Sequence, residues 1–280
     1  MGGSLRRHAA VWFMTPLMLL TTLAGLARTE VRMEVLLDVP YLEVDGVTLT
    51  LDVYRAAGDG PHPALIAVHG GSWYRGDKSQ WSGSAADLVG AGFTVFAIDY
   101  RLSPPGGSAG FGDALRDVQR AIGWVEGHAS TYEVDPDAIG LIGSSAGAHL
   151  ALLAGQREKL SGVRAVAAWS PPVNLAALAG GRLRAAIEGF IGCSVLRCPG
   201  RYDRMSPLHN VATFDPATFL ANSTDELIPL KQVRSMARRL EGAGVTAKLV
   251  AIPGSAHGQQ LRSFVLDDTI SFFKTRLAKI

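Results

Sequence analysis

Charged side chains are scarce and nearly balanced in this sequence of 280 residues. Lys, Arg, Asp and Glu together make up 19% of the chain, and the formal net charge at pH 7 is only +2. No run of Lys and Arg residues occurs, so we expect no nucleic-acid partner. Hydrophobic residues make up 48%, which excludes the composition of a disordered protein. The length and composition predict one globular domain with a sizeable core.

Cysteine is almost absent, since Cys193 and Cys198 are the only two. Two cysteines without a histidine at ligand spacing do not make a metal site. We therefore expect no metal ion, and nothing in the sequence implies an organic cofactor. In an oxidising compartment the two cysteines would close a small disulfide loop, although so short a spacing also arises by chance.

The N-terminal segment has the pattern of a targeting sequence. Arg6 and Arg7 precede an apolar stretch that ends in small residues near Ala27. We predict that residues 1–28 are a cleaved signal peptide, that residues 29–280 form the folded domain, and that the protein is secreted or periplasmic. The alternative is an uncleaved membrane anchor, because the stretch is long for a signal peptide.

Apolar runs typical of strands alternate with helical patterns through the rest of the chain. The eight predicted strands are 31–39, 47–54, 64–68, 93–98, 139–142, 163–169, 218–221 and 247–252. The five predicted helices are 79–91, 111–127, 146–156, 229–242 and 263–277. This alternation predicts an α/β fold with a mostly parallel sheet, helices on both faces and an antiparallel edge made by the first two strands. Residues 171–215 break the rhythm and are interpreted as a cap-like insertion.

The pattern G-x-S-x-G occurs twice, at residues 143–147 and 106–110. A nucleophilic serine needs a sharp turn between a strand and a helix, which Ser145 has and Ser108 lacks. We therefore predict Ser145 as the nucleophile and interpret Ser108 as part of a loop.

A glycine-rich turn, His69-Gly70-Gly71-Ser72-Trp73, follows the third predicted strand. Backbone N–H groups in such a turn can stabilise the negative oxygen of a tetrahedral intermediate. We predict an oxyanion hole formed by the N–H groups of Gly70, Gly71 and Ala146. His69 is interpreted as a structural residue, and Ser72 and Trp73 as residues that contact the substrate.

A serine hydroxyl needs a base, and the base needs an acid that fixes its tautomer. His257 follows the last predicted strand, at the sheet edge where Ser145 is expected, whereas His149 is expected to pack against the sheet. Asp225 follows the seventh strand and is predicted as the acid, with Glu226 as the rival. The catalytic residues are then Ser145, Asp225 and His257, in the chain order Ser, Asp, His.

Taken together, these motifs make the chain resemble the α/β-hydrolase esterases related to hormone-sensitive lipase and to bacterial feruloyl and acetyl-xylan esterases. The resemblance also rests on three further segments, which are DYRLSP at 99–104, SPL at 206–208 and DELIP at 225–229. It implies an α/β-hydrolase fold, hydrolysis of short-chain or aryl carboxylic esters through an acyl-enzyme, and a small-molecule or polysaccharide-linked ester as substrate. In these families the segment that begins at Asp99 is structural.

Two residues depart from the pattern of these esterases, and a further family is also similar. Many relatives have a third glycine where this chain has Ser72, and a glycine where it has Ala148. Kynurenine formamidases have a similar glycine-rich loop, and Asp77-Lys78-Ser79 follows it here as it does in them, so the alternative is an arylformamidase. A binding protein without catalysis is the third hypothesis, and the complete set of predicted catalytic residues argues against it.

Overall fold

The structure is a computed structural model that describes residues 33–56, 60–104, 111–156 and 162–278. The predicted signal peptide and Ser108 lie outside these residues. No helix in the described ranges is long and apolar enough to cross a membrane.

One sheet of eight strands runs through the described chain, in the order β1-β2-β4-β3-β5-β6-β7-β8. β1 pairs with β2, and β2 with β4, in antiparallel register, and every later pairing is parallel. The strands are β1 (Met33–Val44), β2 (Val47–Ala56), β3 (His62–Val68), β4 (Thr94–Ile98), β5 (Val134–Ser144), β6 (Val163–Trp169), β7 (Ala217–Ser223) and β8 (Ala247–Ile252). This is the predicted α/β arrangement, with the antiparallel edge where the sequence placed it.

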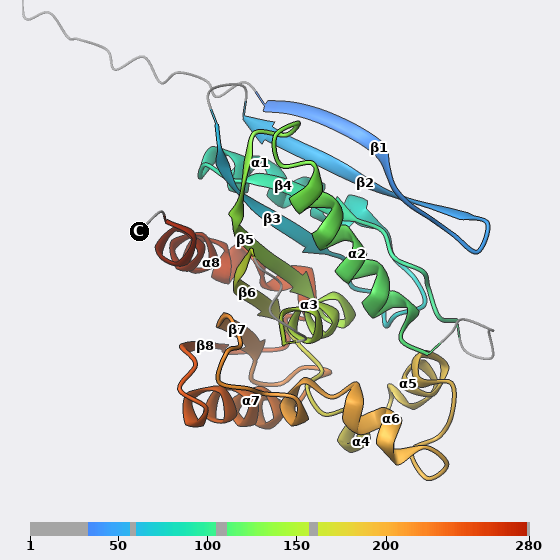
Figure 1. Ribbon diagram of the computed structural model, residues 1–280. Helices are drawn as coiled ribbons and strands as arrows, with labels where there is room; N and C mark the ends of the chain where they lie inside the picture. The colour runs from blue at the N-terminus through green and yellow to red at the C-terminus, as the bar shows by residue number, and fades with distance from the viewer. Residues whose placement is uncertain (1–32, 57–59, 105–110, 157–161, 279–280) are drawn as a thin grey trace, which may run out of the picture. The chain divides into compact units, whose positions relative to one another are not determined.

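Helices connect the parallel strands, as the sequence predicted. They are η1 (Lys78–Trp81), α1 (Ser82–Gly90), α2 (Asp113–Gly127), α3 (Ala146–Gln156), α4 (Leu175–Leu178), α5 (Arg184–Ile191), α6 (Pro199–Arg204), η2 (Pro207–His209), α7 (Leu230–Gly242), η3 (Gly258–Leu261) and α8 (Arg262–Leu277). Figure 1 shows α2 and α3 on one side of the sheet and α8 on the other.

Alternating side chains of the central strands build two cores, one on each face of the sheet. Ile66 of β3 packs in the core that α2, α3 and α7 cover, whereas its neighbour Leu65 packs in the core under α1 and α8. Both Leu65 and Ile66 are fully buried. β3 therefore has a continuous apolar sequence because both of its faces are covered.

β5 is longer than the sequence predicted. The sequence predicted this strand over 139–142, because the Asp135-Pro136-Asp137 segment before it is typical of a turn. Residues 135–137 nevertheless belong to the strand and lie at an irregularity in its register against β3. The Asp135 side chain accepts a hydrogen bond from the N–H of Asp137 at 3.0 Å there. The local turn chemistry is thus accommodated inside a strand, so it gave a false boundary.

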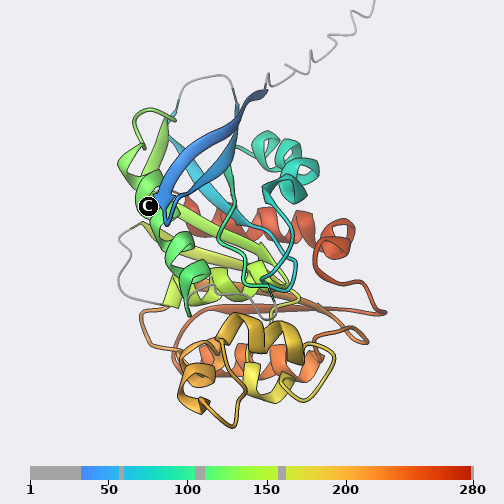
Figure 2. The same cartoon turned by 90° about the vertical axis from the view of Figure 1, so that its right-hand side faces the viewer.

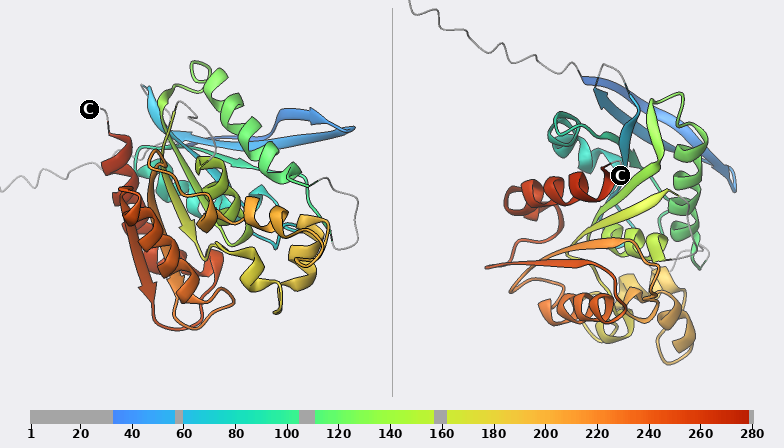
Figure 3. Two further views of the ribbon diagram at one scale, coloured as in Figure 1. Left: turned by 60° about the horizontal axis from the view of Figure 1, so that its bottom comes forward. Right: turned by 60° about the vertical axis from the view of Figure 1, so that its left-hand side comes forward.

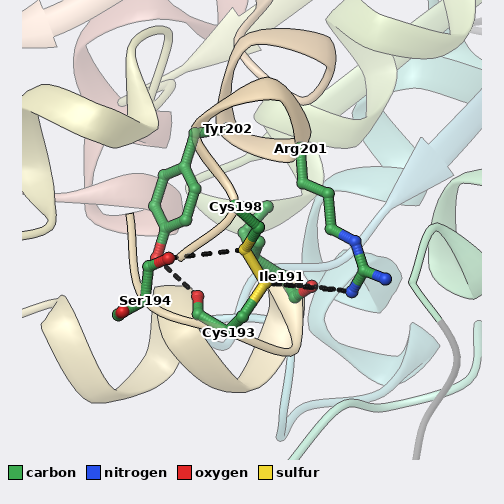
Figure 4. The surroundings of a disulfide bond; sticks show 6 residues. All are labelled: Ile191, Cys193, Ser194, Cys198, Arg201 and Tyr202. Atoms are coloured by element: carbon green, nitrogen blue, oxygen red, sulfur yellow. Dashed lines mark hydrogen bonds between the residues drawn. A yellow bond between two sulfur atoms is a disulfide. The ribbon is translucent and has the colours of Figure 1, made fainter. Parts of the chain in front are cut away.

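The segment between β6 and β7 contains three short helices, α4, α5 and α6, and the turn η2. Figures 2 and 3 show these yellow and orange elements gathered at one end of the sheet. A disulfide joins Cys193 and Cys198, whose Cα atoms are 6.3 Å apart. In Figure 4 the Tyr202 hydroxyl donates to the carbonyl oxygen of Cys193 (2.9 Å), and Arg201 donates to that of Ile191 (3.2 Å). These contacts fasten α5 to α6.

Candidate active site

Ser145 lies on a sharp turn between β5 and α3. Its backbone has φ 53°, a left-handed conformation that is unfavourable for a residue with a Cβ atom. The flanking glycines make this turn sterically feasible. A Cβ atom at Gly143 would lie 2.4 Å from the carbonyl oxygen of Gly147, and one at Gly147 would lie 2.1 Å from that of Val68. The glycines of the motif are therefore required by close backbone contacts.

His257 lies beside Ser145, in the loop after β8. Its Nε2 atom is 2.9 Å from the Ser145 hydroxyl oxygen, and its Nδ1 atom makes a short hydrogen bond to a carboxylate oxygen of Glu226. A carboxylate can only accept, so Nδ1 carries the proton and the neutral ring leaves Nε2 as an acceptor for the serine hydroxyl. The sequence placed Ser145 and His257 at one edge of the sheet, and the structure brings them together there.

The acid is where the structure departs from the sequence prediction, because Glu226 and not Asp225 contacts His257. The backbone N–H of Asp225 donates to the carbonyl oxygen of Gly254 (2.9 Å), and the residue is exposed. The Glu226 side chain, one residue later, is 0% exposed. Residues 224–228 form a bend after β7, in which Asp225 faces solvent and the Glu226 side chain faces His257.

The second carboxylate oxygen of Glu226 is held by groups that sequence reasoning missed. It accepts hydrogen bonds from the Ser170 hydroxyl (2.8 Å) and from the N–H of Ser223 (3.2 Å). The Ser170 oxygen also accepts from the N–H of Gly258, next to His257, at 2.9 Å. Ser170 is completely buried. Its contacts hold both the Glu226 carboxylate and the backbone beside His257, and in the sequence only its position directly after β6 pointed to it.

The glycine-rich turn lies close to Ser145, because a Cβ atom at Gly70 would be 3.5 Å from the Cβ atom of Ser145. The N–H of Gly70, however, has another partner. That N–H donates to the side-chain oxygen of Gln80 at 3.1 Å. The N–H of Gly71 makes no hydrogen bond within the described residues. Ala146 is the first residue of α3, so its N–H group has no hydrogen-bond partner within the helix. Two of the three predicted donors, Gly71 and Ala146, therefore remain available.

Gly71 is required for the shape of this turn. Its φ is +123°, and a Cβ atom there would lie 1.9 Å from the carbonyl oxygen of Arg75. Ser72 follows with φ 54° and is partly exposed. Trp73 is 1% exposed and stacks on Phe190, with ring centroids 4.9 Å apart. The expectation that Trp73 contacts the substrate is therefore wrong, because the insertion covers its indole.

His69 makes contacts that fit the structural role predicted from the sequence. Its ring is buried, stacks on Tyr100 with centroids 4.2 Å apart, and makes a hydrogen bond from Nδ1 to the Gly70 carbonyl oxygen at 2.7 Å. Burial lowers the pKa of His69, which keeps the ring neutral. The Tyr100 hydroxyl donates to the His69 carbonyl oxygen at 3.1 Å. The segment that begins at Asp99 thus supports the glycine-rich turn.

Asp77-Lys78-Ser79, the segment shared with formamidases, makes only structural contacts among the described residues. Asp77 caps η1 by accepting from the N–H of Ser79 at 2.8 Å. The Lys78 amine pairs with Asp38 (2.7 Å) and Asp99 (3.2 Å). Nearby carboxylates raise the pKa of Lys78 despite the opposing effect of burial. The segment therefore gives no support for amide hydrolysis.

A hollow of about 730 Å³ opens beside His257 and Glu226. One wall comes from the insertion and the other from the loops after β7 and β8. Its apolar lining is Ala177, Leu178, Leu183, Leu227 and Pro229, and its polar lining includes Arg182, Asp225 and Ser255. The insertion therefore lines a space next to His257.

The BD-FAE family model matches residues 51–240, a range that includes the glycine-rich turn, Ser145 and Glu226. The chain belongs to the BD-FAE family. The resemblance to α/β-hydrolase esterases is thereby confirmed, whereas His257 lies beyond the matched range of the BD-FAE model.

Curated relatives of this BD-FAE chain are named as esterases. It is 30% identical to Esterase LipQ of Mycobacterium tuberculosis over 260 residues, which is 84% of this chain and 61% of LipQ. It is also 30% identical to the probable isoprenylcysteine alpha-carbonyl methylesterase ICMEL1 of Arabidopsis thaliana over 230 residues, 74% of this chain and 48% of that protein. This BD-FAE chain thus spans about half to three-fifths of the length of these relatives.

Among solved structures, a truncated carbohydrate esterase from gut microbiota superposes with a TM-score of 0.79. The two are 24% identical, and the match covers 88% of this chain and 97% of the other. At that identity the likeness establishes the shared fold, which is the α/β-hydrolase fold predicted from the sequence.

Proposed function

We propose that this protein is a serine hydrolase that cleaves carboxylic esters, with Ser145 as nucleophile, His257 as base and Glu226 as acid. The observation that carries the proposal is the continuous chain of contacts from the Ser145 hydroxyl through the His257 ring to Glu226. The esterase names of the curated relatives support the same reaction class.

The proposed reaction follows from these positions. Ser145 attacks the ester carbonyl while His257 Nε2 takes the hydroxyl proton, and Glu226 stabilises the imidazolium that forms. The N–H groups of Gly71 and Ala146 stabilise the negative oxygen, aided by the N-terminus of α3. His257 then gives its proton to the leaving alcohol, and water releases the acyl group from Ser145 by the same steps.

We place the alcohol part of the ester in the hollow beside His257. The leaving oxygen must lie next to Nε2 to receive its proton, so the rest of the alcohol extends to that side of Ser145. A hollow of about 730 Å³ is much larger than a methoxy group requires. Its lining carries both an apolar wall and polar groups, which suits an aryl or other bulky alcohol with polar substituents.

Two measurements test the proposed function. Purified protein should hydrolyse p-nitrophenyl acetate, and Ser145→Ala should lower kcat by about 10⁵-fold or more. A fluorophosphonate probe should label Ser145 covalently, and Ser145→Ala should abolish labelling. The proposal fails if the folded wild-type protein neither cleaves aryl esters nor reacts with the probe.

The position of the alcohol is tested by varying it while the acetyl group stays the same. Aryl acetates should show a higher kcat/KM than methyl acetate, after correction for leaving-group pKa. Leu227→Ala should reduce that preference. If Leu227→Ala instead changes the preference for acyl-chain length and leaves the alcohol preference intact, the hollow holds the acyl group.

A further inference from the structure

His149 is a buried histidine that the proposed reaction does not use. It lies one helical turn after the nucleophile, and its backbone N–H donates to the carbonyl oxygen of Ser145 at 3.0 Å. Its ring is 0% exposed. Sequence reasoning expected it to pack against the sheet, but its polar contacts are with the glycine-rich turn and with the insertion.

Both ring nitrogens of His149 have partners, which fixes the tautomer. The Trp73 indole N–H donates to Nδ1 at 3.2 Å, so Nδ1 is an acceptor and the proton is on Nε2. Nε2 donates to the Met205 carbonyl oxygen at 2.7 Å. Burial lowers the pKa of His149 to about 4, so the ring is neutral at pH 7. The neutral ring thus joins the turn after β3 to the end of α6.

The turn that His149 contacts needs such support. Ser72 and Trp73 both have left-handed backbones, with φ 54° and 65°. A residue with a Cβ atom is strained in this backbone conformation and keeps it only where the surrounding structure enforces it. The Trp73 indole packs against Phe190 and His149, whose ring centroids are 4.9 and 5.3 Å away. The backbone carbonyl oxygen of Trp73 accepts a hydrogen bond from the N–H of Ser103 at 2.7 Å.

We propose that His149 is a positioning residue, which acts through Trp73 to hold the Gly71 N–H in the geometry that stabilises the tetrahedral intermediate. This inference rests on the proposed esterase function. Gly71 lies two residues before Trp73, so a shift of the indole moves the donor directly. Removing the acceptor also leaves the buried indole N–H unpaired, which favours a relaxed turn. Because the developing oxyanion is present only after attack, the loss should appear in kcat more than in KM.

Two substitutions at His149 separate positioning from packing. His149→Leu fills much of the space but accepts no hydrogen bond, whereas His149→Asn places an amide oxygen near the position of Nδ1. With p-nitrophenyl acetate, His149→Leu should lower kcat by about 10- to 100-fold and change KM by less than about threefold. His149→Asn should recover most of kcat. Equal losses in the two folded variants would overturn the proposal.

A double-mutant cycle tests whether His149 acts through Trp73. Trp73→Phe keeps an aromatic ring on Phe190 but removes the N–H. If the two residues act as one unit, the double variant should be no slower than His149→Leu alone, because the shared contact is already lost. Losses in kcat that multiply would overturn the proposal. Should His149→Leu fail to fold, the cycle is measured with His149→Ala, and Trp73→Phe alone must still lower kcat.

An inhibitor that imitates the intermediate gives a readout that simple loss of packing would not produce. A boronic acid adds to Ser145 and forms a tetrahedral anion, so its Kd should weaken in His149→Leu by about the same factor as kcat. An unchanged Kd would overturn the inference. A wild-type protein without esterase activity would overturn the proposed function, whereas an active wild type with an unaltered His149→Leu variant would overturn only the inference.

Discussion

Glu226 occupies the position beside His257 Nδ1 that Asp225, its neighbour in the chain, was predicted to occupy. The Glu226 side chain is fully enclosed, and its second oxygen accepts two further hydrogen bonds. Asp225 lies on the open side of the same loop, where it lines the hollow. Two acidic residues adjacent in sequence thus have different surroundings, and this difference can be tested directly.

Glu226→Gln and Asp225→Asn form a matched pair that removes one charge each. In the glutamine variant, the amide can donate to His257 and favour the wrong tautomer, so kcat should fall by about 10³- to 10⁴-fold. Asp225→Asn should keep kcat within about threefold, although KM is free to change. Steady-state hydrolysis of p-nitrophenyl acetate measures both variants. A larger loss for Asp225→Asn would restore Asp225 as the acid.

Ser170 should act on turnover through Glu226. Ser170→Ala removes both the donor to Glu226 and the acceptor for the Gly258 N–H, so we expect kcat to fall by about tenfold with little change in KM. Ser170 has φ 54°, so part of any effect could come from the backbone. Ser170→Gly relieves that strain but also lacks the hydroxyl. Similar kcat values for the two variants support the hydroxyl, whereas wild-type activity in Ser170→Gly would contradict its contribution.

The buried neutral ring of His149 should make stability depend on pH. Its pKa is about 4 in the folded state, against 6.5 for a free histidine. Between these pH values the unfolded chain binds a proton at His149 that the folded chain does not. The free energy of unfolding is therefore undiminished by this group above pH 6.5 and decreases as the pH falls toward 4. The loss should reach about 3 kcal/mol in the free energy of unfolding.

Urea denaturation at pH 7 and pH 4.5 measures this loss, with His149→Asn as the control that does not titrate. His69, whose pKa is also lowered, is present in both proteins and cancels in the comparison. The decrease in stability should be smaller for His149→Asn. Identical decreases would show that His149 is not the group responsible.

Gly147 should tolerate no side chain. A Cβ atom there would lie 2.1 Å from the carbonyl oxygen of Val68, which belongs to a central strand and cannot move away. Gly147→Ala should lower the free energy of unfolding by about 3 kcal/mol. Gly123→Ala is the control, because nothing lies within 4 Å of its added Cβ in α2, and it should stabilise the helix by about 0.5–1 kcal/mol. Equal melting temperatures for the two variants would contradict this account.

Local sequence patterns determined most of the fold. The continuous apolar run at 64–68 and the glycines around Ser145 place a buried strand and a strand-to-helix turn with no reference to distant residues. The pairing of Ser145 with His257 followed from chain order, since parallel strands end at one edge of the sheet. Where a local signal was ambiguous, as at the 135–137 turn chemistry inside β5, the predicted boundary was wrong.

Only the tertiary structure decided which group at each position faces the site. The choice between Glu226 and Asp225 depends on which way a loop turns, and the backbone bond from Asp225 to Gly254 sets that direction. The Gln80 side chain accepts the hydrogen bond of the Gly70 N–H group. Phe190, from a segment more than a hundred residues away, stacks on Trp73. The sequence by itself predicted the sheet and the approach of His257 to Ser145 at its edge, because strand and turn signals are local. The carboxylate that contacts His257, the free N–H groups of the proposed oxyanion hole and the support of the glycine-rich turn depend on contacts between distant segments, which exist only once the chain has folded.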